Sequence, residues 1–288
     1  MLRLSVNLLS NMIGYLKEIK STDNYLLREP MVPYHSYSVS IDSLCELATC
    51  CGWIESLNGY AHVAQRGKLI LSQPGFGLTY QKLQLMLHDY VLKIRPIWAN
   101  RILYGRKEAF IFMTKDEKAC FLEAGLMSDE ISKEIIGWWD SLAAELRQSE
   151  NEKMNAIGRH GEKLTIQYEY NRTGKRPQWM SVDSNLAGYD LISQIDSTQN
   201  IKMLIEVKAS SMPINLANFH VTLNEWKVAS TSNCYRFYIW SINDVISLAV
   251  VTPEELQSLM PINQQSGEWE TVRIPFSAFT NCFKVINP

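Results

Sequence analysis

Two acidic residues and a lysine in the second half of the chain have the types and spacing that can hold a divalent metal ion. Glu206 and Lys208 interrupt the apolar run that begins at Leu204. Because alternate residues of a β-strand point to the same face, the two share one face, while Ile205 and Val207 point into the core. Asp190 lies sixteen residues upstream (206 − 190) in the preceding candidate strand. A hairpin between these strands would bring its carboxylate next to Glu206.

Two carboxylates held this close repel each other unless a cation lies between them. Mg²⁺ and Mn²⁺ suit such a site, because Mg²⁺ usually takes one or two carboxylates, several waters and a substrate phosphate. Lys208 would orient or deprotonate an attacking water, while the metal lowers the pKa of that water and stabilises the phosphorane. The residues therefore predict metal-dependent hydrolysis of a phosphodiester.

The periodicity around these residues predicts the elements that must position them. A capping box, Thr222 with Glu225 three residues later, starts the second helix of this region. The predicted elements are a helix over 154–170, strands over 178–183, 189–194 and 203–209, a helix over 222–230, strands over 235–242 and 246–251, and a short helix over 253–259. The core order is α-β-β-β-α-β.

These residues and this order resemble the PD-(D/E)XK restriction-endonuclease-like superfamily, and more narrowly the NO VEIN C-terminal family, which is akin to Mrr-type nucleases. Four motifs carry the resemblance over about a third of the chain. They are GRHGE ending at Glu162, GYD ending at Asp190, IEVK ending at Lys208, and LNEW ending at Trp226. Tyr189 stands where the superfamily usually has a proline.

The resemblance implies roles for individual residues. Asp190, Glu206 and Val207 correspond to metal ligands for Mg²⁺ or Mn²⁺, Lys208 to the water-activating base, and Glu162 to a supporting acid on the helix. It also implies a Mg²⁺-dependent deoxyribonuclease, an endonuclease of a prokaryotic restriction or anti-phage defence system. Two alternatives stay open: a catalytically inactive nucleic-acid-binding or scaffolding module, and a winged-helix regulator.

A basic turn, NRTGKRP, follows the first helix of this region. Arg172, Lys175 and Arg176 are the predicted contacts to the DNA backbone, because phosphate contacts position a nuclease without reading sequence. The alternative is a solvated charged loop.

The first half of the chain is expected to form a separate, mainly helical domain over 1–149, with the nuclease-like domain over 150–288. Residues 40–72 predict a winged-helix-like unit: a helix, a hairpin around Asn58–Gly59, and the segment RGKLIL. No lysine or arginine occurs between Ser40 and Gln65, whereas acidic residues do. We therefore expect this domain to bind a second copy of the chain or a partner defence protein, through the apolar stretch with Trp53 and Tyr60, rather than DNA bases. The alternative is that these residues fill the domain's own core.

Bulk properties limit the class of protein. The chain has 288 residues, 46% of them hydrophobic and 20% charged, with a net charge of −2. Nucleic acid must therefore be bound through local patches. Six cysteines without a CxxC pair indicate reduced thiols. The segment from Met1 to Lys20 is interpreted as an amphipathic helix rather than a signal peptide, and no run is long enough to span a membrane, so we expect a cytoplasmic protein.

Overall fold

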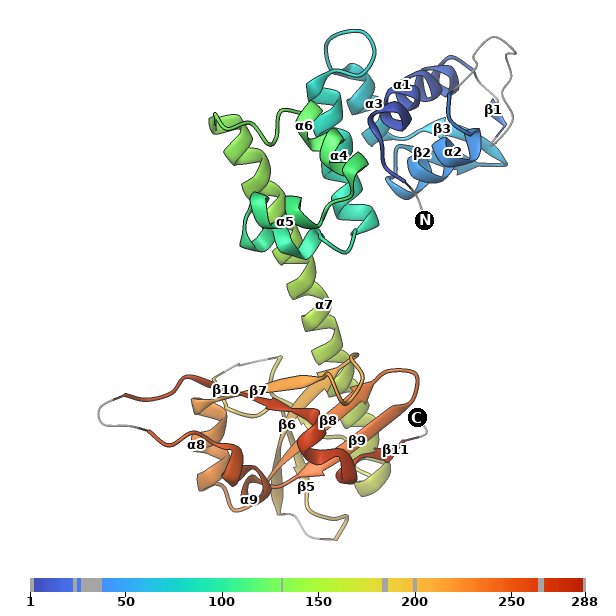
Figure 1. Ribbon diagram of the computed structural model, residues 1–288. Coiled ribbons are helices and arrows are strands. Elements are labelled where there is room, and N and C mark those ends of the chain that lie inside the picture. Colours follow the sequence, from blue (N-terminus) through green and yellow to red (C-terminus); the bar gives the residue numbers. More distant parts are fainter. Residues whose placement is uncertain are drawn as a thin grey trace. The chain divides into compact units, whose positions relative to one another are not determined.

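The protein is a mixed α/β chain that divides into two compact units, Met1–Glu150 and Asn151–Pro288 (Figure 1). A computed structural model describes residues 3–22, 25–26, 38–130, 132–182, 186–198, 201–263 and 267–286. Helices dominate the first unit, and a mixed sheet forms the second. This confirms the predicted fold class, which is α/β with a mainly helical first domain. No helix in the described ranges is long and apolar enough to cross a membrane.

The first unit contains six helices of its own in the described residues, one 3-10 helix and a small sheet. Its elements are α1 (Val6–Ser21), β1 (Tyr25–Leu26), α2 (Ile41–Cys50), β2 (Ile54–Leu57), β3 (Tyr60–Val63), α3 (Gln65–Ser72), α4 (Tyr80–Ile94), η1 (Ala99–Tyr104), α5 (Arg106–Phe112) and α6 (Lys115–Glu123). Helix α7 (Lys133–Thr173) begins in this unit and ends in the second.

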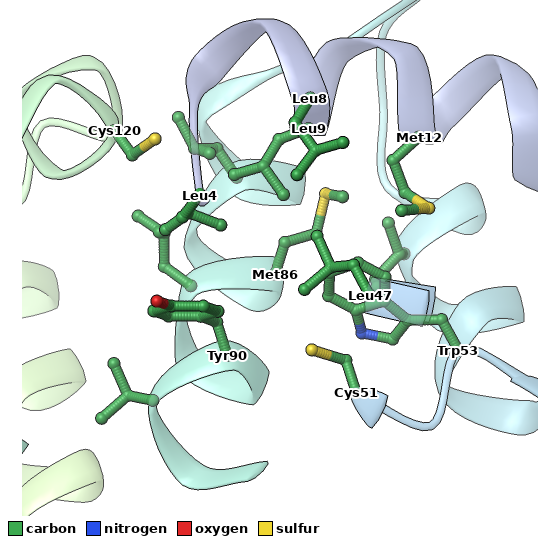
Figure 2. Close-up of a cluster of buried hydrophobic side chains, with 14 of the residues drawn as sticks. Leu4, Leu8, Leu9, Met12, Leu47, Cys51, Trp53, Met86, Tyr90 and Cys120 are labelled. Carbon is green, nitrogen blue, oxygen red and sulfur yellow. The ribbon is translucent and has the colours of Figure 1, made fainter. Parts of the chain in front are cut away.

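The apolar faces of α1, α2 and α4 meet in one core. Leu9, Met12 and Leu47 are fully buried there, and Figure 2 shows them beside Met86 and Trp53. The amphipathic periodicity of α1 is confirmed, although Met1 and Leu2 lie outside the described residues. Because the aromatic and aliphatic side chains here fill the unit's own core, they are not free to form an interface.

The predicted hairpin and the helix before it are both confirmed. Strands β2 and β3 pair in antiparallel register, joined by Asn58 and Gly59, which both have positive φ as a two-residue hairpin turn requires. The N-cap of α2 is Ser40, and the RGKLIL segment forms helix α3.

The second unit contains a six-stranded sheet in the order β11-β9-β8-β6-β5-β4 and a separate β10-β7 ribbon. Its elements after α7 are β4 (Gln178–Trp179), β5 (Leu191–Gln194), β6 (Lys202–Ser210), β7 (Asn218–Thr222), α8 (Leu223–Thr231), β8 (Tyr235–Ile242), β9 (Ile246–Val251), α9 (Pro253–Leu256), η2 (Gln257–Leu259), β10 (Thr271–Pro275), η3 (Phe276–Cys282) and β11 (Lys284–Val285). Strand β6 pairs parallel with β8, and the other pairs are antiparallel.

Both faces of this sheet are covered. One face, with Ile205 and Val207 of β6, packs against α7. The other face packs against α8 and the β7–β10 ribbon, and Phe237 of β8 lies in its core. Strand β6 is therefore covered on both sides, although Glu206 and Lys208 alternate with its apolar residues Ile205 and Val207.

Several predicted boundaries need correction. The helix expected over 154–170 is the second part of a longer helix, α7, which runs through the expected domain boundary between residues 149 and 150. The strand expected over 178–183 ends at Trp179, and Asp183 lies outside the described residues. Strand β5 starts after Asp190. Strand β7 and its partner β10 were not predicted.

Candidate active site

Asp190 lies directly before the first residue of β5 and extends its pairing with β6. Strands β5 and β6 form the expected antiparallel hairpin, in which Leu191 lies opposite Ile205. The main-chain N–H of Asp190 donates to the Ile205 carbonyl at 2.9 Å. Two residues further along β6, the Asp190 side chain takes the place of a main-chain acceptor from β5. Its Oδ2 accepts the Val207 N–H at 2.8 Å. The carboxylate is thereby fixed beside the residue that follows Glu206.

The carbonyl of Val207 points to the same side as this carboxylate. Successive strand residues direct their N–H and C=O groups to opposite neighbours. Leu204 donates toward β8, to the carbonyl of Cys234, whereas Ile205 accepts from the β5 side. Val207 therefore presents its carbonyl on the β5 side, past Leu191, where β5 has already ended. Only this main-chain oxygen of Val207 can serve as a metal ligand.

Glu206 and Lys208 lie on the face of β6 that α8 covers, opposite the face that carries Ile205 and Val207. The Lys208 Nζ lies 2.7 Å from Glu206 Oε1 and 3.0 Å from Glu225 Oε2. Glu206 is only 5% exposed. The expectation that Ile205 and Val207 point into a core is confirmed. The opposite face is covered as well, so the Glu206 and Lys208 side chains are largely removed from water, and their ion pair offsets part of the free-energy cost of that desolvation.

Glu225 also belongs to the site, although the sequence predicts only a helix cap at this position. The capping box is confirmed, because Glu225 Oε2 accepts the Thr222 N–H at 2.9 Å. The same oxygen also accepts from Lys208. The one available signal was that the helix following the Glu-x-Lys strand opens on a fixed glutamate. Pairing it with Lys208 required knowing that α8 packs on that face of β6.

Burial and mutual repulsion disturb the charges of these groups. Burial raises the pKa of Asp190 to about 6, and the Glu162 and Glu225 carboxylates add to the rise, against the Val207 N–H and Lys208. Burial also raises the pKa of Glu206 well above its ordinary value, although Lys208 opposes this. Burial alone would lower the pKa of Lys208, but Glu206 and Glu225 together raise it above its ordinary value. Lys208 is therefore a charged ammonium in this arrangement.

Glu162 is buried on α7 and holds the end of β4. Its Oε2 accepts hydrogen bonds from Trp179 Nε1, from Ser181 Oγ at 2.5 Å and from Arg159 at 2.9 Å. Ser181 in turn donates its main-chain N–H to the carbonyl of Asp190 at 3.1 Å. Glu162 thus reaches the site through the segment that supports Asp190.

Gly161 brings α7 close to the strand that carries the site. A Cβ at this position would lie 2.7 Å from Ala209 Cβ and 3.2 Å from Val207 Cγ1. Both contacts are closer than ordinary van der Waals separation. The second glycine of the GRHGE motif therefore sets the distance between helix and sheet behind Val207.

The basic turn lies at the other end of β5. The Arg172 guanidinium pairs with Glu169 and donates to the carbonyls of Gln194 and Ile195. Gln194 is the last residue of β5, whereas Asp190 precedes its first. Arg172 is thus engaged in holding α7 to the strand, while Lys175 and Arg176 are exposed. The structure does not bring these three residues to Asp190 and Glu206.

The donors at the site match the preferences of a hard divalent cation. No group of three or more His, Cys, Asp or Glu side chains suited to a metal occurs among the described residues. The candidate set is instead two carboxylates and the Val207 carbonyl. Only Oδ2 of Asp190 and Oε1 of Glu206 have hydrogen-bond partners in the described part of the chain, so one oxygen of each remains. Mg²⁺ is commonly held by one or two carboxylates, so this set fits it.

Residues 161–248 match the family model described as Protein NO VEIN, C-terminal. This segment, less than a third of the chain, is similar to that family, as the four motifs predicted. It includes Glu162, Asp190, Glu206, Lys208 and Glu225. No curated protein and no solved structure matches the chain.

Proposed function

We propose that the second unit is a metal-dependent nuclease that hydrolyses phosphodiester bonds of DNA, with Mg²⁺ or Mn²⁺ as its cofactor. One observation carries the proposal: the Asp190 carboxylate is bound to the Val207 N–H, directly beside Glu206 on the strand that also bears Lys208. The similarity of residues 161–248 to the NO VEIN C-terminal family supports it. A restriction or anti-phage role rests on the wider resemblance alone.

Asp190, Glu206 and the Val207 carbonyl would hold the metal at the edge left open where β5 ends. When bound, such an ion lowers the pKa of a water and stabilises charge on the phosphate. Glu162 supports Asp190 through Ser181 and is a positioning residue.

Lys208 acts as a cation in this proposal. The sequence left open whether it orients or deprotonates the attacking water. Its raised pKa, caused by Glu206 and Glu225, favours the protonated form. An ammonium donates hydrogen bonds and stabilises negative charge, but it takes up no proton. Lys208 therefore orients the water or the phosphate oxygen rather than serving as the base.

DNA is the proposed partner of the second unit. For the first unit we propose a partner protein or a second copy of the chain in preference to DNA, because helix α2 carries Asp42 and Glu46 and no cation. Acidic side chains at that position would repel phosphates.

The test is incubation of the full chain with supercoiled plasmid in Mg²⁺, Mn²⁺, Ca²⁺ or EDTA. Cleavage is expected with Mg²⁺ and Mn²⁺ and little with Ca²⁺, whose looser coordination positions the attacking water poorly. Glu206→Gln should lower the rate about a thousandfold. The matched control is Glu268→Gln, which removes an exposed carboxylate paired with Lys227. Cleavage in EDTA or by Glu206→Gln would contradict the proposal, and DNA binding without cleavage by the parent would favour a non-catalytic module.

A further inference from the structure

A pocket of about 410 Å³ lies at the C-terminal end of β6, where Ala209 and Ser210 line it. It is bounded by α7, β6, the segment after β6, and the β7–β10 ribbon. Its lining residues include Met154, Ile157, Ser210, Met212, His220 and Arg273. The volume is in the range of small-ligand pockets, and one wall is apolar while the other carries cationic and hydrogen-bonding groups.

The polar wall is built by the register of the ribbon. His220 of β7 lies directly opposite Arg273 of β10 in an antiparallel pair. Their neighbours Phe219 and Ile274 are buried in the core, so the alternation of the strands turns His220 and Arg273 to the exposed face. The two side chains therefore act as one donor pair facing the same pocket.

The charge of this pocket is positive. None of its lining residues is acidic. Arg273 makes no ion pair within the described ranges of the chain, whereas Arg172 and Arg159 of the same unit are both paired with glutamates. An exposed guanidinium beside hydroxyl and imidazole groups matches the oxygens of a phosphate.

The pocket is continuous with the proposed site along two segments of the chain. Ala209 and Ser210, which line it, directly follow Lys208 on β6. On the other side, β7 ends at Thr222, which caps α8 and bonds to Glu225, the residue that holds Lys208. The pocket is therefore connected to Lys208 in two ways, through the next residues of β6 and through the hydrogen bonds from Thr222 and Lys208 to Glu225.

We propose that this pocket binds a nucleotide of the nucleic-acid substrate adjacent to the scissile bond. Arg273 and His220 contact its phosphate, and the apolar wall of Met154 and Ile157 contacts its sugar or base. The inference rests on the proposed nuclease function and specifies where the substrate strand runs. This nucleotide lies at the opposite end of β5 from the basic turn at Arg172, which is left to contact DNA further from the scissile bond.

The experiment measures binding without cleavage. Full-length protein carrying Glu206→Gln is titrated against fluorescein-labelled duplex and single-stranded DNA of 20 nucleotides in EDTA, at several salt concentrations. Arg273→Gln is expected to weaken binding about fivefold to tenfold and to reduce the salt slope by about 1. Arg273→Lys should recover most of the affinity. The matched control is Lys284→Gln, which removes an exposed charge on β11, at the far edge of the sheet from β5.

The outcomes separate this inference from the proposed function. Weaker binding by Arg273→Gln but not by Lys284→Gln supports the pocket, even if the parent protein never cleaves DNA. Equal affinities for Arg273→Gln and its parent overturn the pocket, even if Mg²⁺-dependent cleavage is observed. Absence of binding to either DNA by the parent also overturns it. Thermal unfolding of each variant identifies any that has lost its fold, and His220→Gln then provides the second variant on the same wall.

Discussion

Glu225 Oε2 lies 3.0 Å from Lys208 Nζ and 2.9 Å from the main-chain nitrogen of Thr222. One oxygen therefore fixes both the first turn of α8 and the lysine of the candidate site. The ammonium is held between two carboxylates from different elements, so its position depends on how α8 packs on β6. This arrangement makes Glu225 a positioning residue for Lys208.

Glu225→Gln is predicted to lower the cleavage rate about tenfold to a hundredfold while leaving stability nearly unchanged. Glutamine also closes a capping box, but it removes the charge next to Lys208. Glu255→Gln is the matched control, since Glu255 occupies the same capping position in α9 and bonds to Thr252. Cleavage rates and melting temperatures check both variants. If Glu225→Gln cleaves as fast as the parent, the role of Glu225 is limited to capping α8.

Metal-free protein is predicted to lose stability as the pH rises from about 4 to about 6.5. Burial raises the pKa of Asp190 to about 6, so in this interval the folded state binds more protons than the unfolded state. Stability therefore falls with rising pH, by up to about 3 kcal/mol for a shift of this size. Asp190→Asn should remove this part of the dependence and stabilise the metal-free protein at pH 7.5. Urea unfolding across the pH range, in EDTA, measures it.

The same shift gives a metal readout that needs no activity. Mg²⁺ binds the ionised carboxylates, so it should raise the melting temperature of the parent above pH 6 and have little effect at pH 5. Asp190→Asn should lose most of this response. An equal rise in melting temperature for parent and variant would place the metal elsewhere.

Gly161→Ala is predicted to destabilise the protein by about 1–3 kcal/mol and to reduce cleavage. The added methyl group would push α7 away from Ala209 and Val207. Gly158→Ala provides the control on the same helix. A Cβ there meets no atom within 4 Å, so the change should stabilise the helix by about 0.5–1 kcal/mol. Chemical denaturation of both variants decides whether close packing at Gly161 is required.

The basic turn is predicted to separate into a structural and a binding part. Arg172→Gln should cost about 3 kcal/mol or more of stability, because it leaves the buried Glu169 without its cation. The double change Lys175→Gln and Arg176→Gln should leave stability unchanged. It is expected to weaken DNA binding similarly across sequences and to lower the salt slope, by about 1 for each phosphate that is no longer neutralised. An unchanged slope would show that DNA does not reach the turn.

Apolar runs, turn residues and capping boxes in the sequence predicted several helices and strands of the second unit correctly. Strands β8 and β9 match the predicted ranges 235–242 and 246–251 residue for residue, and α8 begins at the predicted cap. These segments combine apolar runs with clear turn or capping signals. Asp190 and the Glu206–Lys208 strand were brought together by the hairpin that the sequence predicted.

Other parts depend on long-range contacts that no local pattern contains. Strand β7 is five residues long, and its partner β10 follows about fifty residues later. The pairing of Glu225 with Lys208 and the engagement of Arg172 with β5 likewise join separate elements. The domain boundary was expected inside α7 because the polar middle of this helix resembles a linker, yet the helix contains no proline that would break it.

Helix α7 also limits how the protein can be divided. Its residues Leu142 and Leu146 pack in the core of the first unit. In the second unit, Gly161 of the same helix packs against β6, and Glu162 accepts a hydrogen bond from Ser181. The units have separate cores, but their boundary at Glu150 and Asn151 falls inside a helix. A module swap at that point would have to rebuild an interrupted run of i to i−4 hydrogen bonds. Each unit has its own core, but one helix belongs to both. Exchange of units between related proteins should therefore succeed only where the joined segments continue α7 without inserting or deleting residues.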